Sequence, residues 1–373
     1  AGQLRGALDQ FAGVELAHFG YVSGLAFVYV LLIGPVDFLL LKWTRRMEWT
    51  WLSFPLIAVF FCVLAFTLAG SWRVDELRMN QVDLVDVDVA GGRVRGTTWL
   101  NLYSPRSELY DFSLAPRLEP LGGQRPEVVL SWQGLPGGAL GGMEQGASGL
   151  GVQTGEYAIS TSFDALAGVP IPIWSTKALT ARWQLRPQPL RPQPRLTASL
   201  TQGADGVVEG SVTSNLPFAL ENCLLAGGRW VYRLGELKPG QTVPLRAGSQ
   251  ITFQSVLKGA KLVREKEHSV VQVNTPYDPA SFDVPVILRQ MMFHELSGGT
   301  HYAGLSNRYQ AFVDLSDHLE LRRAVLWGEA EGAAAEVRRE GQPLAGSHDR
   351  HLTVYRFVLP VEEHAGKRKE SEF

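Results

Sequence analysis

Two apolar stretches near the start of the chain, VSGLAFVYVLLIGPVDFLLL (22–41) and WLSFPLIAVFFCVLAFTL (51–68), decide its fold class. A helix rises about 1.5 Å per residue, so either stretch spans roughly the 30 Å hydrocarbon core of a bilayer. Together they contain a single charged residue, Asp37. The sequence therefore predicts a transmembrane hairpin over 19–71, with helices over 21–42 and 50–69.

The connection between the two stretches, residues 42–50, is short and basic. Positive charge favours the cytoplasmic side of a membrane, so both chain ends are expected outside. We therefore predict the bacterial cytoplasmic (inner) membrane as the location, with the bulk of the chain extracytoplasmic, in the periplasm. The residues expected at the membrane interface are Lys42, Trp43, Arg45, Arg46, Trp49, Trp51 and Trp72.

Asp37 is the one intramembrane polar residue that stands out. A carboxylate within a span is a candidate for an ion or proton pathway. Asp37 lies near the basic turn, however, and we expect it to pair with Arg45 or Arg46. Gly34 and Pro35 just before it are expected to kink the helix.

The segment before the hairpin, residues 1–18, carries Leu4, Leu8 and Phe11 at helical spacing. This stripe predicts an amphipathic helix lying on the outer membrane surface. The alternative is a linker from an upstream domain. We favour a fragment of a longer protein, since the chain begins without Met, and no signal-peptide pattern precedes the first apolar stretch.

After residue 72 the pattern changes to short runs rich in β-branched and aromatic residues, such as VDLVDVDV (82–89) and GTTWLNLY (96–103). Such runs, separated by turn residues, predict β-sandwich-like extracytoplasmic domains with a few short helices. The fold class is thus membrane-anchored and mainly β. Two separate sandwiches and one continuous sheet system both fit the pattern. The expected segments are a first β-domain (72–185), a Pro-rich strap (186–194), a β-sandwich (195–275), a mixed α/β segment (276–361) and a disordered tail (362–373).

One helix within the mixed segment has clear signals. Asp283 is a good N-cap and Pro285 suits a first turn, where its missing N–H costs little. Ile287, Leu288 and Met291 form an apolar stripe. We expect Gly298-Gly299 to stop this helix.

No catalytic signature is present: the sequence lacks a Walker A motif, a dinucleotide fingerprint and a GxSxG elbow. HELSG (294–298) begins like a zinc-protease helix, but Gly298 replaces the second histidine, so that ligand pair cannot form. We predict no catalytic residues, no cofactor and no metal, with polar loops as the ordinary explanation. The weak metal candidates are His294, His301, Asp314 and His318, near Glu295 and Asp317.

Other polar and sulfur-bearing residues receive structural interpretations. Asp83, Asp86 and Asp88 would hold calcium only if their strand bulges, so a solvent-facing acidic edge is expected. Cys62 and Cys223 lie in such different segments that no disulfide is predicted. The net charge of −2 gives no indication of nucleic-acid binding.

Aromatic side chains are the remaining signal. Exposed aromatic rings bind sugars, so carbohydrate is the alternative partner, although strand aromatics are usually core. The tryptophans concerned are Trp99, Trp132, Trp174, Trp183, Trp230 and Trp327.

The hairpin LLIGPVDFLLLKWTRRMEWTWLSFPL, the following NQVDLVDVDVAGGRVRGTTWLNLYSP and the later FHELSGGTHYAGLSNRYQAFVDLSDHLELRRAVLWG and VYRFVLPV resemble uncharacterised bacterial membrane proteins, including ones from planctomycete-like genomes. Those proteins carry a Gly-Pro-x-Asp/Asn motif in one helix, a basic turn, and Trp and Pro opening the next helix. The resemblance covers most of the chain. It implies a membrane-anchored extracytoplasmic β protein, often with a further external domain before the first helix, and it supplies no catalytic residues.

These features together predict a non-catalytic subunit or scaffold of a bacterial cytoplasmic-membrane assembly. Its partners would be the lipid bilayer and other membrane or periplasmic subunits. Two alternatives stay open: a cell-envelope carbohydrate-binding module, and an uncharacterised enzyme or metal site around His294 and His301.

Overall fold

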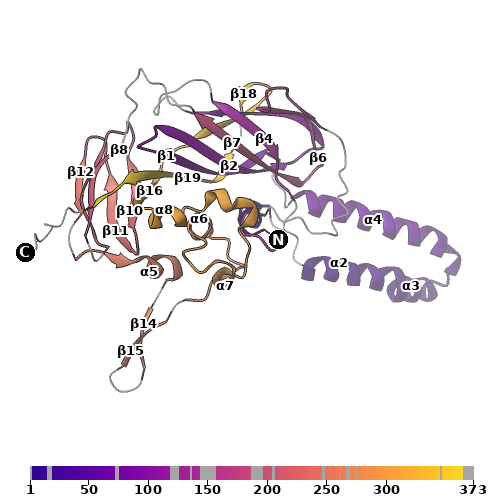
Figure 1. Ribbon diagram of the computed structural model, residues 1–373. Helices are drawn as coiled ribbons and strands as arrows, with labels where there is room; N and C mark the ends of the chain where they lie inside the picture. The colour runs from indigo at the N-terminus through magenta and orange to yellow at the C-terminus, as the bar shows by residue number, and fades with distance from the viewer. Residues whose placement is uncertain are drawn as a thin grey trace, which may run out of the picture. The chain divides into compact units, whose positions relative to one another are not determined.

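The chain forms two compact units, the helical unit (10–77) and the β-rich unit (1–9 with 78–373). This is seen in a computed structural model (Figure 1). The residues that it describes are 2–14, 19–71, 75–117, 126–134, 137–142, 157–185, 196–203, 206–245, 248–259, 261–265, 269–273, 275–344 and 347–363.

The helical unit consists of two antiparallel helical runs. The first run joins α2 (Phe19–Leu31), a π-helical turn η1 (Leu32–Val36) and α3 (Asp37–Trp43); the second contains the short η2 (Met47–Trp49) and α4 (Thr50–Ser71). The π-helical turn holds Gly34 and Pro35, and proline removes one hydrogen bond from the helical ladder. The irregularity expected at this position is therefore present as a widened turn.

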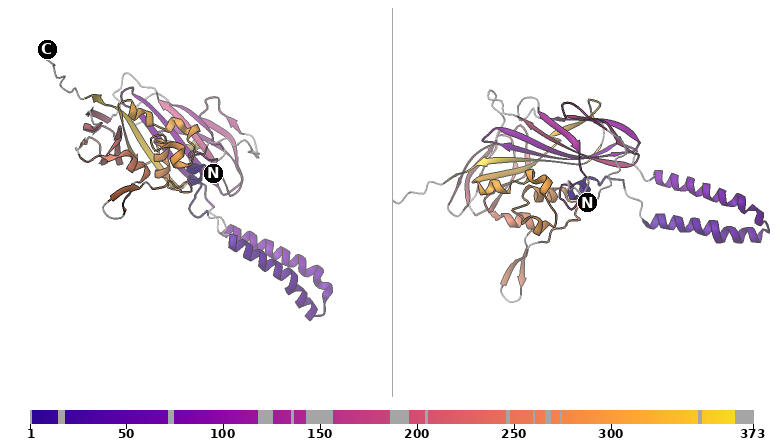
Figure 2. Two further views of the ribbon diagram at one scale, coloured as in Figure 1. Left: turned by 60° about the horizontal axis from the view of Figure 1, so that its bottom comes forward. Right: turned by 45° about the vertical axis from the view of Figure 1, so that its right-hand side comes forward.

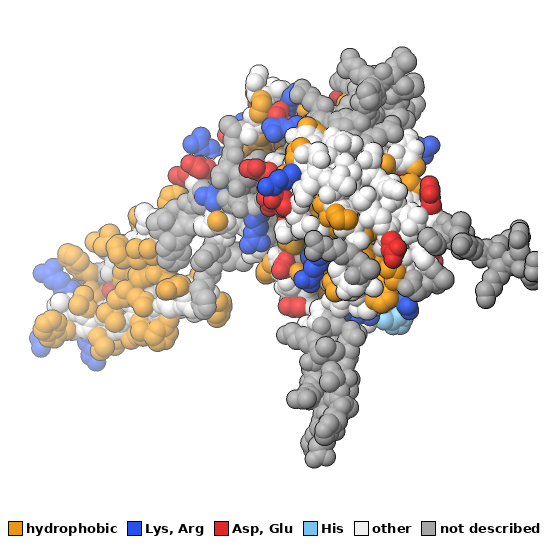
Figure 3. Space-filling model, turned by 90° about the vertical axis from the view of Figure 1, so that its left-hand side faces the viewer, with side chains coloured by type: hydrophobic (Ala, Val, Ile, Leu, Met, Phe, Trp, Pro, Cys, Tyr) orange, Lys and Arg blue, Asp and Glu red, His pale blue; other side chains and the backbone are white. Residues whose placement is uncertain are grey.

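The apolar side chains of the helical unit face outward. Only 11% of the apolar window in Phe19–Trp43 and 6% of that in Met47–Leu68 is buried. Figure 3 shows hydrophobic side chains covering this unit, with Lys and Arg gathered at one end. Both helices are long and apolar enough to cross a membrane. The two long apolar helices and the mainly β character of the remaining chain confirm the coarse fold prediction.

A nine-stranded sheet forms the centre of the β-rich unit, in the order β13-β11-β10-β16-β19-β1-β2-β7-β4 (Figure 1). Its central strands β1 and β2 are buried on both sides along most of their length, although both carry polar residues. Its strands are β1 (Arg78–Asp88), β2 (Arg93–Ser104), β4 (Glu127–Trp132), β7 (Ser175–Leu185), β10 (Leu220–Gly227), β11 (Trp230–Leu237), β13 (Ile251–Thr252), β16 (Arg323–Ala330) and β19 (Ser347–Pro360).

Three smaller sheets complete the unit, in the orders β18-β17-β3-β6-β5, β12-β9-β8-β20 and β14-β15. Figure 2 shows the β14-β15 pair extending away from the other sheets. The strands are β3 (Glu108–Pro116), β5 (Ala158–Ile159), β6 (Ala165–Ile171), β8 (Leu196–Gln202), β9 (Val208–Ser214), β12 (Thr242–Leu245), β14 (Lys261–Glu265), β15 (Ser269–Val273), β17 (Ala335–Arg339), β18 (Gln342–Pro343) and β20 (Glu362–Glu363).

The large sheet takes strands from all three predicted segments, 72–185, 195–275 and 276–361. The boundaries that we predicted therefore do not separate compact units, and the continuous sheet system is the correct one of the two alternatives. The reason is strand β19, which pairs in parallel with β1 and antiparallel with β16. Local patterns do not reveal such distant partners. The strap (186–194) and residues 364–373 lie outside the described residues.

Short helices cover one face of the large sheet (Figures 1 and 2). They are α1 (Gln3–Leu8), α5 (Phe253–Lys258), α6 (Val284–Met292), α7 (Gly299–Ala303), η3 (Arg308–Val313) and α8 (Ser316–Glu320). We call α6, α7, η3 and α8 the helical layer. Ile287, Leu288 and Met291 of α6 are fully buried in a core that also contains Trp99 and Trp327.

The α6 helix begins as predicted. Asp283 caps it by accepting a hydrogen bond from the Val286 backbone N–H at 3.1 Å, and Pro285 lies in the first turn. The helix ends at Met292, however, well before the predicted stop at Gly298-Gly299. The intervening residues form hydrogen-bonded turns around His294, described below.

The first helix corrects a prediction. Leu4, Ala7 and Leu8 of α1 are fully buried in the same core as α6, so the apolar stripe contacts protein instead of a membrane surface. The Asn80 side-chain amide donates to the Leu8 carbonyl at 2.8 Å, which fixes the end of this helix on strand β1. Amphipathic spacing predicted the buried face correctly but not what buries it. Residues 15–18 lie outside the described residues.

Candidate metal centre and polar cavity

His294 lies in the turn that follows α6, and its imidazole is 3% exposed. Its Nε2 is 3.1 Å from the carbonyl oxygen of Leu305. Its Nδ1 is 3.4 Å from Oε1 of Glu295, whose side chain is 73% exposed. The imidazole is thus held between a backbone carbonyl inside the protein and a carboxylate at the surface.

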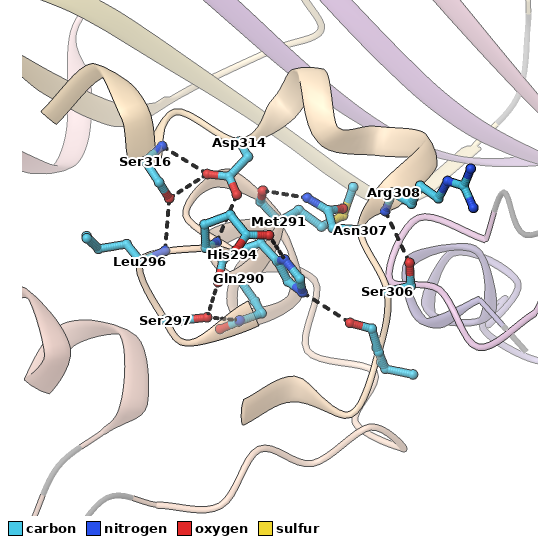
Figure 4. Close-up of polar contacts among 12 residues, drawn as sticks. Gln290, Met291, His294, Leu296, Ser297, Ser306, Asn307, Arg308, Asp314 and Ser316 are labelled. Carbon is cyan, nitrogen blue, oxygen red and sulfur yellow. Dashed lines mark hydrogen bonds and ion pairs between the residues drawn. The ribbon is translucent and has the colours of Figure 1, made fainter. Parts of the chain in front are cut away.

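Asp314, between η3 and α8, lies near His294 (Figure 4). Its Oδ2 accepts a hydrogen bond from the Glu295 backbone N–H at 2.9 Å. Its Oδ1 accepts from the Ser316 N–H at 2.9 Å and from the Ser316 hydroxyl at 2.6 Å. These bonds hold the Asp314 carboxylate in one orientation and join the ends of α6 and α8.

Further hydrogen bonds fix the turn itself, as Figure 4 shows. The Ser297 hydroxyl donates to the His294 carbonyl at 2.7 Å and accepts a short hydrogen bond from the Gln290 amide. The Asn307 amide donates to the Met291 carbonyl at 3.2 Å. Because Gln290, Ser297 and Asn307 are buried, the loss of any of these partners would leave a buried polar group unsatisfied.

His294, Glu295 and Asp314 each offer a ligand atom, and these atoms all lie within 4.8 Å of one another. Two of the four candidates from the sequence, His294 and Asp314, are therefore brought together. His301, exposed on α7, and His318, half-buried on α8, lie outside this group.

The environment of His318 is unfavourable for a positive charge. Burial lowers its pKa, and the positive charges of Arg323, Arg95 and Arg356 lower it further, against an opposing effect of Asp86. A histidine in this setting is neutral at pH 7. The exposed Asp317 on the same helix also lies outside the group.

A cavity of about 480 Å³ opens between the large sheet and helices α5 and α6. Burial lowers the pKa of Arg289, while the charges of Glu329 and Asp283 oppose this shift. The charged groups that line the cavity are the guanidinium groups of Arg233 and Arg289 and the carboxylate of Glu329. Its lining residues are Asn222, Cys223, Leu224, Arg233, Gly235, Ser255, Val256, Arg289, Trp327 and Glu329.

Asn222 shapes one wall of the cavity. Its φ of 52° is in the left-handed region, and the register of β10 shifts on either side of Cys223. A bulge of this kind redirects a side chain. The Asn222 amide donates to Oε2 of Glu329 at 3.0 Å. Sequence reasoning missed this cavity, and the polar pair Glu221-Asn222 within an otherwise apolar strand was its one local signal.

Cys223 has no reactive character. Burial raises the pKa of its thiol to about 12, so it is protonated at neutral pH and is not a nucleophile. Its Sγ lies 3.4 Å from the Leu220 carbonyl oxygen. Cys62 and Cys223 are both free.

The acidic residues of β1 do not form a solvent-facing edge, which corrects that expectation. Asp83 is fully buried and accepts hydrogen bonds from the Thr98 hydroxyl at 2.6 Å, the Gln81 amide at 2.8 Å and the Ala334 N–H at 3.0 Å. β1 lies between β19 and β2 and so is not an edge strand, and the Asp83 carboxylate meets donors of the chain instead of water.

Asp86 forms ion pairs with two arginines. Burial raises its pKa, but the charges and hydrogen bonds of Arg356 and Arg95 outweigh burial and hold the pKa below its usual range. Arg95 also donates to the Phe312 carbonyl at 3.1 Å. These contacts attach the helical layer to the sheet. Asp88, at the end of the strand, accepts from the Gly91 N–H at 3.0 Å in the following turn.

The tryptophans considered for sugar binding lie mostly inside the protein. Trp99, Trp183 and Trp327 are 0%, 3% and 5% exposed. Trp132, Trp174 and Trp230 are half-buried. No exposed aromatic platform is built from these six residues, so the structure adds no support for carbohydrate binding.

In the helical unit, Asp37 is 7% exposed, and its Oδ2 accepts a hydrogen bond from the Ser53 hydroxyl at 3.1 Å. Its described partner is therefore Ser53 on the neighbouring helix, in place of the expected Arg45 or Arg46. The Arg46 guanidinium lies over the Trp49 ring, 5.5 Å from its centroid.

The remaining predicted interface residues are at the surface of the helical unit. Trp43 and Trp51 are 86% and 90% exposed, and Lys42 lies over the Phe38 ring at 5.8 Å. Trp72 lies outside the described residues.

Comparison with known proteins gives a match to one family model and matches among solved structures. Residues 195–299 match the model of a domain of unknown function (DUF8725). No match was found among the curated proteins. Among solved structures, a yeast delta-COP-I mu-homology domain complexed with a Dsl1 WxWxV peptide is 7% identical; the match covers 78% of this chain and 98% of that one. Its TM-score of 0.29 carries no argument about fold or function.

Proposed function

We propose that this protein is a non-catalytic, membrane-anchored component of a bacterial cytoplasmic-membrane assembly, and that its β-rich unit binds protein partners on the periplasmic side. The observation that carries the proposal is the outward-facing apolar surface of the helical unit. Phe66 and Leu56, for example, are 73% and 70% exposed. Contiguous apolar surface of this extent is unfavourable in water, and a lipid bilayer is the medium that suits it.

The charges of the helical unit support an orientation. Lys42, Arg45 and Arg46 lie at the turn between the two runs, and such a cluster favours the cytoplasmic side. Both ends of the helical unit would then face the periplasm, as would the β-rich unit that follows.

The non-catalytic part of the proposal is supported by the described thiol and carboxylate groups, which are protonated or hydrogen-bonded inside the protein. The Cys223 thiol is protonated, and the Asp83 and Asp86 carboxylates are engaged by internal donors. His301 and His318, two of the candidates from the sequence, lie outside the group around His294. A nucleophile next to a general base, the usual arrangement for covalent catalysis, is absent from the described sites.

The cavity beside Arg289 is the place where we expect a partner to bind. Arg233 and Arg289 both line it, and guanidinium groups bind carboxylates through paired hydrogen bonds. Trp327 supplies an apolar wall, and aromatic and Arg residues are those most enriched at protein interfaces. Most of the lining lies within the region that matches DUF8725. An acidic side chain of a partner protein fits this chemistry.

Purification tests the assembly. The protein is extracted from native membranes in a gentle detergent, sized, and analysed by mass spectrometry for co-purifying proteins. Defined partners in fixed proportion are expected. A single monodisperse species that contains this chain alone would contradict the proposal.

The orientation is tested by labelling. In a Cys62→Ala background, we expect Ser162→Cys in the β-rich unit to react with a membrane-impermeant maleimide in spheroplasts. Thr44→Cys in the turn should react only after the membrane is permeabilised. Ser162 and Thr44 are both exposed, so accessibility of the side chain itself does not bias the comparison. Equal labelling of both in intact spheroplasts would contradict the orientation.

A further inference from the structure

We propose that His294, Glu295 and Asp314 together bind one divalent transition-metal ion, of the class of Zn²⁺ or Mn²⁺. The three ligand atoms lie within 4.8 Å of one another. His294 and Glu295 lie in the turn after α6 and Asp314 lies between η3 and α8, and hydrogen bonds hold both segments. The inference is independent of the proposed function, because an ion here would serve the β-rich unit whether or not that unit binds a partner.

The argument begins with the imidazole of His294. Its Nε2 faces the Leu305 carbonyl oxygen at 3.1 Å, and a carbonyl only accepts, so Nε2 carries the hydrogen. In the neutral ring Nδ1 then presents a lone pair. Oε1 of Glu295, 3.4 Å away, is also an acceptor. Nδ1 and this carboxylate therefore both present lone pairs, and a metal ion between them would satisfy both.

The hydrogen bond at Nε2 is the arrangement found at metal-binding histidines. A ligating imidazole commonly donates its other N–H to a backbone carbonyl or carboxylate, which fixes the tautomer and the ring orientation. At 3% exposure His294 has little freedom to turn away. The ring is therefore oriented for binding through Nδ1 before any ion arrives.

Asp314 supplies the second fixed ligand. A carboxylate oxygen has two lone pairs, and Oδ2 uses one of them for the Glu295 backbone N–H. The other lone pair remains for an ion. The two hydrogen bonds from Ser316 to Oδ1 hold the group in place, as the residues around a metal site usually do (Figure 4).

Glu295 supplies the movable ligand. Metal–ligand distances of about 2.0–2.2 Å around a tetrahedral ion place its ligand atoms roughly 3.5 Å apart, so ligand atoms separated by up to 4.8 Å must draw closer to bind one ion. The exposed Glu295 side chain is the ligand with the freedom to move. Its exposure also leaves the outer positions of the ion open to water.

The ligand types select the class of ion. One imidazole nitrogen and two carboxylate oxygens suit Zn²⁺ and Mn²⁺, whereas Ca²⁺ and Mg²⁺ favour sites made of oxygen alone. The ion would join the end of α6 to the start of α8. Because only the folded turn assembles these ligands, binding would stabilise the helical layer.

Calorimetry tests the proposal. The untagged full chain in gentle detergent is stripped of metal and titrated with ZnCl₂ and, separately, with MnCl₂. We expect one site for at least one of the two ions. Glu295→Gln should weaken it about tenfold or more, since it removes a charged ligand from an exposed position without disturbing the core. Thermal unfolding of the metal-free variant, expected to match the wild type, checks the fold.

His301→Gln is the matched control, because His301 is an exposed histidine of the same segment that lies outside the group. It should retain the wild-type affinity. The proposal is overturned if the wild type binds neither ion. It is equally overturned if Glu295→Gln binds as tightly as the wild type, or if His301→Gln is the variant that loses the site.

Discussion

Arg356 and Asp86 lie directly opposite each other on the parallel strands β19 and β1 and form a two-point ion pair. Arg356 Nε donates to Oδ1 at 2.6 Å and Nη2 donates to Oδ2 at 3.0 Å. The Arg356 side chain is fully buried, and its Nη1 donates to the Val313 carbonyl at 2.5 Å. One guanidinium therefore connects the last long strand, the first strand and the helical layer.

This pair belongs to a row of directly opposed residues that crosses the large sheet from β11 to β4. The row begins at the cavity and passes through the ion pairs of Asp86, so the two polar features share one face. Its members are Arg233, Leu224, Trp327, Arg356, Asp86, Arg95, Gln184 and Glu127.

Arg356→Met is expected to destabilise the β-rich unit by about 3–5 kcal/mol, because it leaves the Asp86 carboxylate without its main buried partner. The free energy of unfolding, measured with urea in gentle detergent, checks this. Arg117→Met is the control: Arg117 pairs with Glu336 at 3.0 Å but is 58% exposed, so a loss of at most about 1 kcal/mol is expected. Equal losses in both variants would contradict the importance assigned to Arg356.

The same pair predicts a pH dependence. The pKa of Asp86 is lower in the folded protein than in the unfolded chain, so the charged pair contributes stability above the unfolded pKa of about 3.9. That stability is lost as the pH falls through the lower folded pKa. At neutral pH Asp86→Asn should be less stable than the wild type, and the difference should shrink below about pH 4. A difference that stays constant down to the acid transition would argue against this assignment.

Gly96→Ala is expected to destabilise the sheet by about 1–3 kcal/mol through overpacking. A Cβ at this position would lie 2.1 Å from ring atoms of Trp183, the residue opposite on β7. Urea unfolding of Gly96→Ala, Trp183→Leu and the double variant measures the coupling. If the clash is the cause, the double variant should be more stable than the sum of the two single losses predicts.

Arg289→Met is expected to separate stability from binding. Removing a cation from a desolvated position should leave the melting temperature unchanged or raise it, while co-purification of partners should fall. Arg229→Met serves as the control, since Arg229 is exposed and does not line the cavity. Unaltered partner recovery with Arg289→Met would remove the cavity from the proposed interface.

Features that depend on local sequence were predicted well. The helical unit follows from the length of two apolar runs, and α6 follows from the Asp283 cap and its apolar stripe. Both signals lie within a few residues of what they control. The buried stripe of α1 was also visible, but its partner lies hundreds of residues later, so a membrane surface was an equally good guess.

Features that depend on distant pairing were not predictable in the same way. The acidic residues of β1 seemed to be solvent-facing because the donors that engage them, such as the Ala334 N–H and the Arg356 guanidinium, come from the other end of the chain. His294 and Asp314 were recognised as ligand types, yet they are 20 residues apart, and their proximity depends on how the whole helical layer folds. The cavity is built from five elements in separate parts of the chain, so the polar pair Glu221-Asn222 alone was not enough to predict it.

The central position of β19 has a consequence for biosynthesis. The large sheet stays divided until residues 347–360 have left the ribosome, because β19 separates β16 from β1. Under the proposed membrane anchoring, the apolar helices, translated long before, would enter the membrane while β1 still lacks β19. During that interval the unpaired edge of β1 is open to wrong partners. A chain truncated before Ser347 is thus expected to reach the membrane but to be captured there by chaperones and proteases.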